Sequence, residues 1–593
     1  MADKKTEKIN IPSIADFPEV PSSWGGMLWN ETGSWRFAAP LFAERPSPCS
    51  TACPLSNSIP KIMHLVKEGD TKGAFELLAW EDPIPAVLGR VCPAFCVVEC
   101  NRSQYDEAVG IRDIERRLGD DFINSPSPLP RRDKTNKGVG IIGSGPAGLS
   151  AAYFLTLLGH TVTIFERENV AGGIPRLSIP DYRLPKEIVE KTVEAITRMG
   201  VKLRLGAEAG MDTGKNFDAL FVSPGAVVTM ALNIEDENLP GVRSGTELLK
   251  GVKAGSIKEV RGKIAVVGGG NTALDAARTI LRLGGEPVLI YRRTAVEMPA
   301  FADEIKEAAE ENILMEFLKA PVVVKSTDGG RLSVTLIDME LVESDESGRG
   351  RPVPVKGSER TIEIDGLVTA VGEKIDLSPI GYLGNIEGDE KIFIGGDAAG
   401  GDRTVAHAAA SGKRGAVAID LKLMGKNVDL PADRPVSFRA YFNGEEKAEA
   451  EPVSFDEINT DYFPKAERRR PEGLTPEVRT VDFSEIEATL APTDSVYEAS
   501  RCFVCGTCID CKTCESFCPD FTVRAVKMAG KLGFGVEIDY TYCKGCGICV
   551  RECPRGMFTM VDEETIERLG RQDIKGGEKG TTISTDRGEA GDR

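Results

Sequence analysis

The chain has 593 residues, of which 41% are hydrophobic and 28% charged, the balance of a globular protein with several domains. Its 91 acidic and 73 basic residues give a formal net charge of −18, which argues against general nucleic-acid binding because that function needs a basic face. The polar, lysine-rich first ten residues lack the apolar stretch of a signal peptide, and glycines interrupt the long apolar run 139–159. We therefore expect a cytoplasmic protein without a membrane span.

The distribution of the cysteines narrows the function further. Fifteen cysteines fall into two short regions, 49–100 and 502–553, and the roughly 400 residues between them hold none. Structural disulfides belong mainly to small secreted domains, whereas clustered CxxC spacings in a cytosolic chain are typical of metal ligands. Both regions are therefore candidate metal-binding regions.

The first cysteine region lies in a segment with a helical pattern. Positions 59, 62, 63 and 66 are apolar and recur at helical spacing behind the capping residues Asn57 and Ser58, with Pro60 in the first turn. The candidate ligands in this region are Cys49, Cys53, Cys92, Cys96 and Cys100. Buried free thiols are the alternative, although so dense a group of cysteines fits that explanation poorly.

A strand expected at 139–142 leads into a glycine-rich turn and an apolar helix. Gly143 permits the tight turn, Gly145 lets the backbone approach a pyrophosphate, and Gly148 lets helix and strand pack closely. The next strand, 161–165, ends in Glu166, where a carboxylate can accept hydrogen bonds from ribose hydroxyls. The pattern predicts a βαβ unit that binds a dinucleotide. Further residues of this site are Pro146, Ala147 and Arg167.

A second signal far downstream indicates that this dinucleotide is FAD. A strand from Ile392 ends in Gly396 and Asp397, and a helix follows from about Thr404 to Val417. In flavoproteins with two dinucleotide-binding domains, an aspartate at this position holds the ribityl chain, and the helix N-terminus faces the flavin. A purely structural Asp397 that caps the helix is the alternative. The segments 217–225 and 365–372, the latter ending in Gly372, are expected where the chain crosses between the two domains.

The βαβ pattern occurs a second time, from Lys263 to Arg293. The strand 263–267 leads into a GxGxxA turn, and the second strand, 287–290, ends in Tyr291-Arg-Arg instead of a carboxylate. The candidate nicotinamide-site residues are Gly268, Gly270, Asn271, Thr272, Arg292 and Arg293. An arginine pair here can clamp a 2′-phosphate, which favours NADPH over NADH. The alternative is that these arginines are only solvated or stacked on the adenine ring, in which case the site could equally bind NADH.

The second cysteine region contains two runs of the form CxxCxxCxxxCP, the spacing of bacterial ferredoxins. The fourth cysteine of each run ligates the cluster of the other run. One [4Fe–4S] cluster is therefore expected on Cys508, Cys511, Cys514 and Cys553. The other is expected on Cys543, Cys546, Cys549 and Cys518. Zinc competes for isolated CxxC pairs but does not explain two four-cysteine runs that end in Cys-Pro.

These patterns predict an α/β flavoprotein with two dinucleotide-binding (tandem Rossmann-like) domains, an N-terminal α-helical iron–sulfur domain and a C-terminal α+β bacterial-ferredoxin domain. The expected segments are the N-terminal domain 1–135, the first FAD-binding part 136–260, the NAD(P)H-binding domain 261–372, the second FAD-binding part 373–425, a connector 426–500, the ferredoxin domain 501–562 and a mobile tail 563–593. The connector is rich in Pro and Glu and is expected to be mostly irregular.

Over roughly residues 45–425 the chain resembles the small (β) subunit of NADPH-dependent glutamate synthase and its relatives, which include the N-terminal half of dihydropyrimidine dehydrogenase and NADH-linked ferredoxin:NADP oxidoreductases. The resemblance is carried by Cys53-Pro, Gly89-Arg-Val-Cys-Pro, Ala171-Gly-Gly-Ile-Pro-Arg, Tyr182-Arg-Leu-Pro-Lys, Gly268 to Arg278, Tyr291-Arg-Arg-Thr with Met298-Pro, and Gly395-Gly-Asp. It adds Gly172, Gly173 and Arg183 to the cofactor-site candidates and implies [4Fe–4S] clusters in the N-terminal domain. The ferredoxin end resembles a subgroup that exchanges electrons with other redox enzymes.

The resemblance also implies ligands for the N-terminal clusters. Positions matching Cys53, Cys92 and Cys96 bind one cluster, with a non-cysteine fourth ligand at the position of Glu115. Positions matching Cys49 and Cys100 bind a second cluster, whose other two ligands come from an upstream CxxC that this chain lacks. Cys502 and Cys505 form a CxxC pair that the ferredoxin runs do not need, and our hypothesis is that this pair completes the second cluster. The alternative is a single N-terminal cluster, with Cys502 and Cys505 as free thiols.

The expected function is NAD(P)H:acceptor oxidoreduction, in which hydride passes from NAD(P)H to FAD and single electrons pass through [4Fe–4S] clusters to or from a partner redox subunit or ferredoxin, within a hetero-oligomer. This chemistry needs no side-chain nucleophile. Of the three histidines, His160, which precedes a strand, and His407, in the helix after Asp397, are expected to have structural rather than catalytic roles. Two other readings stay open: the small subunit of an NADPH-dependent glutamate synthase, and a non-catalytic scaffold that holds clusters for a larger complex. The acceptor and the direction of electron flow also stay open.

Overall fold

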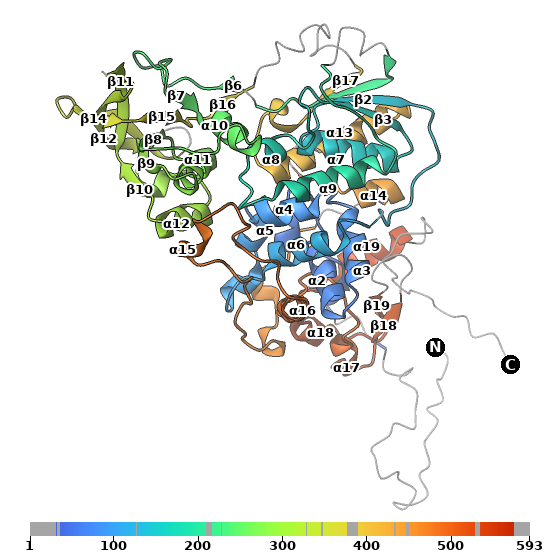
Figure 1. Ribbon diagram of the computed structural model, residues 1–593. Helices are drawn as coiled ribbons and strands as arrows, with labels where there is room; N and C mark the ends of the chain where they lie inside the picture. Colours follow the sequence, from blue (N-terminus) through green and yellow to red (C-terminus); the bar gives the residue numbers. More distant parts are fainter. Residues whose placement is uncertain are drawn as a thin grey trace, which may run out of the picture.

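The computed structural model describes residues 31–32, 36–125, 127–208, 216–226, 228–327, 329–344, 348–375, 390–431, 434–445, 450–527 and 534–573. Figure 1 shows two α/β halves side by side, with the N-terminal helices beneath them and the ferredoxin elements beneath those helices. Among the described residues, no helix has the length and apolar character needed to cross a membrane.

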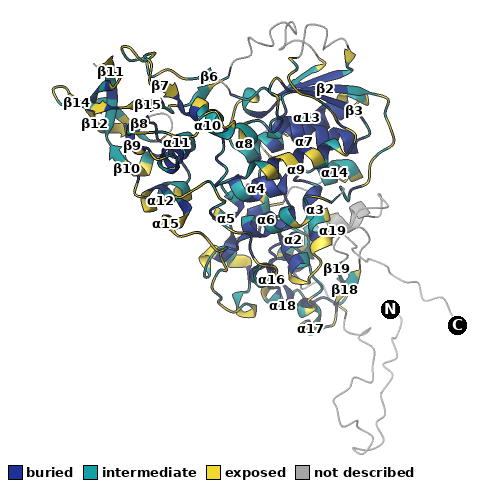
Figure 2. Cartoon of the chain, in the orientation of Figure 1, coloured by how far each residue is buried: buried dark blue, intermediate teal, exposed yellow. Residues whose placement is uncertain are grey.

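The first α/β half is built on a five-stranded parallel sheet with the order β17-β5-β2-β3-β4. Its strands are β2 (Gly138–Ile142), β3 (Thr161–Phe165), β4 (Lys202–Arg204), β5 (Ala219–Val222) and β17 (Ile392–Ile394). Its helices are α7 (Pro146–Leu157), α8 (Ile174–Leu177), α9 (Lys186–Thr197) and α13 (Val405–Leu423). Helix α7 is buried along almost its whole length, and Figure 2 shows it in dark blue beside α13. The expected strand 161–165 is confirmed.

The second α/β half repeats this design. Its parallel sheet has the order β10-β9-β8-β15-β7. The strands are β7 (Val242–Ser244), β8 (Lys263–Val267), β9 (Glu286–Tyr291), β10 (Leu314–Phe317) and β15 (Gly366–Thr369). The helices are α10 (Gly245–Lys253), α11 (Asn271–Arg282) and α12 (Ala302–Glu310). The expected strand 263–267 is confirmed, and the duplication that the sequence predicted is present in the fold.

An antiparallel sheet is added to the second half. Its strands are β11 (Lys319–Ser326), β12 (Leu332–Ser344), β13 (Gly350–Pro354) and β14 (Arg360–Ile364). Val324 and Val334 of this sheet share a buried core with Ala265 and Val267 of β8, so the two sheets pack face to face. Where the chain crosses between the halves, β6 (Val228–Thr229) pairs antiparallel with β16 (Glu373–Lys374).

The N-terminal segment forms a bundle of short helices. They are α1 (Pro48–Ala52), α2 (Ile59–Lys67), α3 (Thr71–Ala79), α4 (Pro85–Val91), α5 (Phe95–Val98) and α6 (Ile111–Phe122). The apolar positions 59, 62, 63 and 66 of α2 are buried, as their spacing predicted. Ser58 occupies the N-cap position but makes no side-chain capping hydrogen bond.

The ferredoxin segment includes a strand from the opposite end of the chain. It contains α17 (Thr513–Ser516), β18 (Val523–Lys527), β19 (Phe534–Ile538), α18 (Ile548–Glu552), β20 (Phe558–Asp562) and α19 (Glu563–Asp573). Strand β1 (Ala38–Phe42) pairs antiparallel with β20, so residues that we expected in the N-terminal domain lie on the ferredoxin segment. Residues 563–573 form a helix where a mobile tail was expected, and Arg36 anchors it through an ion pair with Glu563 at 2.5 Å. The rest of that tail lies outside the described residues.

The connector is largely irregular, as expected, but ion pairs tie it to the N-terminal helices. It contains α14 (Phe438–Asn443), α15 (Pro476–Arg479) and α16 (Pro492–Ser500). Glu485 accepts from Arg90 at 2.6 Å and from Arg116 at 2.8 Å, and Glu498 accepts from the backbone N–H of Gly110 at 2.8 Å. These contacts bring the end of the connector, and the cysteines that follow it, against the N-terminal domain.

Candidate functional site: a flavin cavity and four sets of cysteines

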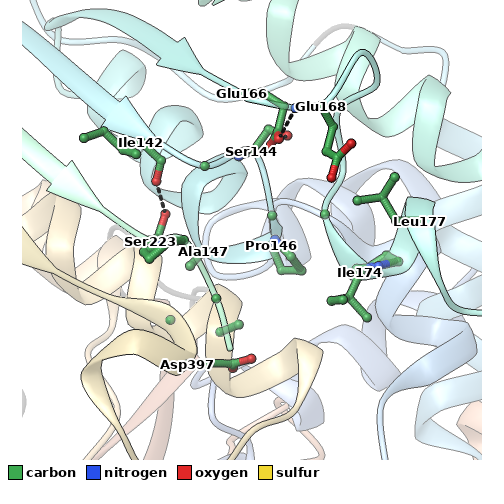
Figure 3. Close-up of a pocket in the computed structure, with 18 of the residues that line it drawn as sticks. Ile142, Ser144, Pro146, Ala147, Glu166, Glu168, Ile174, Leu177, Ser223 and Asp397 are labelled. Carbon is green, nitrogen blue, oxygen red and sulfur yellow. Dashed lines mark hydrogen bonds between the residues drawn. The ribbon is translucent and has the colours of Figure 1, made fainter. Parts of the chain in front are cut away.

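A cavity opens at the carboxyl ends of the strands in the first α/β half (Figure 3). A Cβ added to Gly143, which has φ +97°, would lie 2.4 Å from the carbonyl oxygen of Ser223, and one added to Gly148 would lie 2.0 Å from that of Gly143. Only glycine therefore fits these two positions. At Gly145, by contrast, an added Cβ would meet no atom within 4 Å, so the backbone is open on the side that faces the cavity.

Glu166 is held at the rim of this cavity by local hydrogen bonds. Its carboxylate accepts from the backbone N–H of Ser144 at 3.0 Å, from the hydroxyl of Ser144 at 2.5 Å and from the backbone N–H of Glu168 at 2.9 Å. Figure 3 shows Glu166 and Ser144 joined in this way beside the turn before α7. The carboxylate is thereby oriented, and its remaining lone pairs can accept from a ribose.

The opposite wall is formed by Asp397 and the start of α13. Burial raises the pKa of Asp397, although Arg403 and a backbone hydrogen bond from Ala226 oppose this shift. Thr404 caps α13 by accepting from the N–H of His407 at 3.1 Å, and Thr404 also lines the cavity. A carboxyl group and a helix N-terminus on one wall, with an open glycine turn opposite, fit an elongated dinucleotide such as FAD.

Most of the other predicted flavin-site residues also line this cavity. They are Pro146, Ala147, Arg167, Gly173 and Gly396. A Cβ on Gly173 would lie 2.7 Å from the Cα of Gly145, so this glycine permits a close approach of two backbone segments. Gly172 packs against Val189, which a Cβ at that position would meet at 2.5 Å. Gly372 has φ +114° and accepts from the N–H of Met230 at 2.9 Å where the chain crosses between the halves.

Arg183 lies elsewhere. Its guanidinium donates to both carboxylate oxygens of Asp275, at 2.9 and 2.8 Å, and lies 2.6 Å from Glu304. Asp275 belongs to α11 and Glu304 to α12, so Arg183 joins the two α/β halves and does not line the flavin cavity. The sequence resemblance suggested a cofactor contact for this residue, and the structure gives it an interdomain ion pair.

The second glycine turn has the geometry of a nicotinamide-dinucleotide site. A Cβ on Gly268, at φ +148°, would lie 2.2 Å from the carbonyl oxygen of Ala370, whereas one on Gly270 would meet nothing within 4 Å. Asn271 follows at the start of α11, and its side-chain oxygen accepts from the N–H of Phe301 at 3.0 Å. Thr272 lies in the same first turn of α11.

The two arginines after β9 occupy different environments. Arg292 is exposed, whereas Arg293 is 5% exposed and donates from Nε to the carbonyl oxygen of Gly350 at 2.8 Å. Arg293 therefore holds the antiparallel sheet in place. Arg292 is the one whose side chain is open to solvent.

Four cysteines from opposite ends of the chain line one small cavity: Cys49, Cys100, Cys502 and Cys505. Burial raises the pKa of the Cys49 thiol well above its usual range, and the nearby sulfurs of Cys100, Cys502 and Cys505 raise it further. The side-chain amide of Asn101 donates to the sulfur of Cys505 at 3.6 Å. The sequence hypothesis required these four sulfurs to come together, and the fold brings them together.

Three other N-terminal cysteines gather around Glu115. Burial raises the pKa of Cys96 well above its usual range, and Glu115, Cys53 and Cys92 raise it further. Burial also raises the pKa of Glu115 to about 7, while a hydrogen bond from the side-chain amide of Asn57 to Oε1, at 2.9 Å, lowers it. The sulfur of Cys49 also acts on Cys96, so this set adjoins the previous one.

The ferredoxin cysteines form two further groups. Burial raises the pKa of Cys514 to about 12, and Cys553, Cys511 and Cys508 raise it further. The second group lines a cavity of its own: Cys518, Cys543, Cys546 and Cys549. The fold therefore brings the fourth cysteine of each run to the other run, as the spacing predicted.

The sulfur-rich donor sets suit iron–sulfur clusters, because thiolate is the ligand that these clusters use. Iron binding would release the protons that burial retains on these thiols. Among the described residues, no three His, Cys, Asp or Glu side chains converge closely enough to hold a single metal ion.

His160 and His407 make contacts within the fold. His160 is buried between Asp420, 2.8 Å from Nε2, and Thr135, 2.8 Å from Nδ1. His407 packs edge-on against Phe95, with ring centroids 5.1 Å apart, and burial lowers the pKa of His64.

Sequence reasoning missed Lys413, which donates from α13 to the carbonyl oxygen of Leu55 and to Glu81 at 2.6 Å. It also missed Arg555, although the position directly after Cys553-Pro554 marked that residue as close to a cluster.

Comparisons with known proteins agree with this architecture. Residues 137–412 match the family model described as pyridine nucleotide-disulphide oxidoreductase. Residues 43–126 match dihydropyrimidine dehydrogenase domain II, 4Fe-4S cluster, and residues 507–557 match the 4Fe-4S dicluster domain. Cys502 and Cys505 lie outside all three matched ranges.

Several curated proteins are similar to the chain. The beta subunit of the NADP(+)-dependent formate dehydrogenase of Moorella thermoacetica is 36% identical over 420 residues, which are 63% of this chain and 59% of that protein. The beta subunit of the NADPH-Fe(3+) oxidoreductase of Geobacter sulfurreducens is 36% identical over 346 residues, 56% of this chain and 52% of that protein. The chain thus spans between half and three fifths of the length of these two relatives.

A shorter relative is covered almost fully. The glutamate synthase [NADPH] small chain of Escherichia coli is 32% identical over 409 residues, which are 62% of this chain and 87% of that protein. Together with the tandem dinucleotide-binding fold and the two iron–sulfur regions, this coverage confirms the resemblance seen in the sequence. The chain belongs to the glutamate synthase small-chain family of FAD- and [4Fe–4S]-dependent oxidoreductases, with a ferredoxin segment at its C-terminal end.

Proposed function

We propose that the chain is the electron-transfer subunit of an NAD(P)H:acceptor oxidoreductase, which takes hydride from NAD(P)H and exchanges single electrons with a partner redox subunit or ferredoxin. The observation that carries this proposal is the unbroken order of sites. From the flavin cavity, His407 leads to Phe95 beside the first N-terminal cysteine set, and Cys49 of the second set acts on Cys96 of the first. Arg555 then lies between the second set and one ferredoxin set, and Cys549 of the other ferredoxin set acts on Cys514.

The first step in that order runs from the flavin cavity to the N-terminal domain. Helix α13 starts at the cavity wall, and its residue His407 packs on Phe95, the neighbour of Cys96. Further along α13, Lys413 is 1% exposed at its side chain and pairs with Glu81, whose side chain is 3% exposed. Since the loss of either partner would leave an uncompensated buried charge, this pair fastens the flavin helix to the N-terminal domain.

We assign the first N-terminal [4Fe–4S] cluster to Cys53, Cys92, Cys96 and Glu115. The mutual influence of these four groups on their pKa values supports the assignment, because it places them near one another. Asn57 holds the Glu115 carboxyl through Oε1, which leaves Oε2 as the candidate ligand atom.

We assign a second N-terminal cluster to Cys49, Cys100, Cys502 and Cys505. Three observations support it: the four cysteines line one cavity, their sulfurs act on one another, and the Asn101 amide donates to one of the sulfurs. Such a cluster would link the ferredoxin segment to the N-terminal domain. The ferredoxin clusters then lie on Cys508, Cys511, Cys514 and Cys553, and on Cys518, Cys543, Cys546 and Cys549.

In this scheme the protein's side chains bind and orient the cofactors, and none acts as a nucleophile. Glu166 would hold the adenosine ribose of FAD and Asp397 its ribityl chain, and Arg292 would receive the 2′-phosphate of NADPH. FAD, when bound, supplies the exchange between a two-electron hydride donor and one-electron acceptors. Arg183 and its partners Asp275 and Glu304 fix the two halves relative to each other.

The partner and the location belong to the same proposal. Two relatives are subunits by name, of a formate dehydrogenase and of an Fe(3+) oxidoreductase, which supports a hetero-oligomer with a separate redox subunit. Four sets of cysteine ligands that must stay reduced favour the reducing cytoplasm. A glutamate synthase small subunit is the second candidate, favoured by the likeness to that protein over 87% of its length.

An anaerobic titration of the isolated holoprotein tests the function. NADPH or NADH should bleach the flavin absorbance and then generate the electron paramagnetic resonance signals of reduced clusters, without a partner. Reduction of the flavin with no cluster signal, at full iron content, would contradict the proposal. Co-purification of the native partner would distinguish a redox subunit from the large subunit of a glutamate synthase.

A further inference from the structure

Arg555 is a buried arginine at the junction of two cysteine sets. Its residue is 8% exposed, its guanidinium donates from Nη1 to the carbonyl oxygen of Phe503, and its carbon Cζ lies 5.7 Å from the ring centroid of Phe463. Its own carbonyl oxygen accepts from the N–H of Gly506 at 2.8 Å. Backbone and side chain are therefore both fixed against the segment that carries Cys502 and Cys505.

The charge of Arg555 faces sulfur atoms from both sets. Its guanidinium donates to the carbonyl oxygen of Phe503, which stands between Cys502 and Cys505, and Arg555 itself follows Cys553 by two positions. The sulfurs of Cys511 and Cys553 of one set and of Cys502 and Cys505 of the other all act on this charge. A guanidinium stays protonated in proteins, so the site holds a permanent positive charge. Burial lowers the pKa of the nearby His64 imidazole, and the charge of Arg555 lowers it further.

The neighbouring Arg501 has carboxylate partners, which Arg555 lacks among the described residues. Arg501, whose side chain is 1% exposed, pairs with Glu498 at 2.5 Å and with Asp106 at 3.1 Å. For Arg555, no carboxylate lies within ion-pair distance among the described residues, and its Nε has no hydrogen-bond partner there. Since a buried charge without a counterion is costly, the natural counterions of Arg555 are the anionic sets of sulfur ligands on either side.

We propose that Arg555 is a positioning residue shared by two clusters, one on Cys49, Cys100, Cys502 and Cys505 and one on Cys508, Cys511, Cys514 and Cys553, and that its fixed charge raises the reduction potential of both. The inference rests on the ligand sets of the proposed function. One electron passes between the two clusters with no change in bonding. The reduced form of each cluster carries one more negative charge than the oxidised form, and a nearby cation stabilises it more.

The test uses the full-length holoprotein with Arg555→Gln and Arg555→Met, which remove the charge, and Arg555→Lys, which retains it. Titration with dithionite, followed by electron paramagnetic resonance, measures each cluster potential without NAD(P)H. In the two neutral variants, the reduction equilibrium of both clusters should shift about tenfold toward the oxidised form, which is about 59 mV for one electron. Arg555→Lys should give potentials above those of the neutral variants. Met keeps the apolar stem over Phe463, so it carries the test if the Gln variant assembles poorly.

Arg551→Gln is the matched control. Arg551 precedes Cys553 by two residues and is exposed, so solvent screens the same loss of charge and the potentials should not move. Unchanged potentials in Arg555→Gln or Arg555→Met at full iron content would overturn the proposal. Equal shifts in Arg555→Lys and Arg555→Met would also overturn it, because packing and not charge would then be responsible. A failure of the proposed function would appear in a separate measurement: NAD(P)H would not reduce the flavin of the wild-type holoprotein.

Discussion

The side-chain nitrogen of Asn101 lies 3.6 Å from the sulfur of Cys505, across 404 positions of the chain. The same amide donates to the carbonyl oxygen of Val453 at 2.9 Å, so one buried side chain holds the connector and the CxxC pair together. The contact joins the N-terminal domain to the start of the ferredoxin segment. It is therefore where an interdomain cluster can be tested most directly.

Replacing both Cys502 and Cys505 by Ala should remove about four irons per chain, since a cubane contains four. Flavin content should not change, because the flavin cavity contains neither residue. The measurement is the iron-to-flavin ratio of the purified variant. Ser500→Ala, an exposed change at the end of α16, is the control. If the iron content of the double variant equalled that of the wild type, Cys502 and Cys505 would not be ligands, and a single N-terminal cluster would be favoured.

Replacing Glu166 by Ala should weaken FAD binding by about 1.5–3 kcal/mol, because a charge-assisted hydrogen bond to the ribose is lost. The loss should be visible as reduced flavin occupancy and as a higher Kd on reconstitution of the apoprotein. Glu187→Ala, on the exposed side of α9, should keep its flavin. Full occupancy in the Glu166 variant would show that the carboxylate makes no contact with the ribose.

The two arginines after β9 should differ in their effects. Arg292→Ala should raise the KM for NADPH about 10- to 100-fold, the range expected for the loss of a contact between charged groups, and change the KM for NADH little. Arg293→Ala should also lower the thermal midpoint, because the contact with Gly350 is lost. Steady-state dye reduction with each nucleotide gives the comparison. Equal effects of Arg292→Ala on both nucleotides would place the 2′-phosphate elsewhere.

Asp82 should make the stability depend on pH. Burial raises its pKa to about 8, and the Glu115 carboxyl adds to the shift, whereas the N–H of Ile84 and the Lys413 ammonium oppose it. The pKa of an unfolded aspartate is about 3.9. The folded chain binds this proton more tightly, so the stabilising contribution is complete below about pH 4 and is lost as the pH rises toward 8.

Asp82→Asn removes that titration and keeps an acceptor for the N–H of Ile84. The variant should gain stability over the wild type as the pH rises from 5.5 to 8, by on the order of 1–3 kcal/mol at the upper end, given about 1.4 kcal/mol per pKa unit. Thermal midpoints across this range measure the difference. Asp456→Asn, at an exposed position, serves as the control. A difference that does not vary with pH would mean that Asp82 does not titrate in this window.

The sequence by itself determined the local parts of this protein. Strands 161–165 and 263–267 have the predicted bounds, because each is a short buried run that ends at a clear signal, Glu166 in the first case and Gly268 in the second. Gly143 and Gly268 were identified for the same reason, since a turn with positive φ has to be encoded at the position where it occurs. The two ferredoxin runs were also identified from local sequence, because the spacing of their cysteines is specific to [4Fe–4S] clusters.

Tertiary structure decided what depends on contacts between distant segments. Neither the burial of Arg293 against Gly350 nor the pairing of Arg183 with Asp275 could be predicted, because the local pattern does not record which surface a side chain will meet. The pairing of β1 with β20, across more than 500 positions, is of the same kind. Counting cysteines suggested that Cys502 and Cys505 belong with Cys49 and Cys100, but only packing of the connector along the N-terminal helices, through Glu485 and Glu498, brings those sulfurs to one cavity.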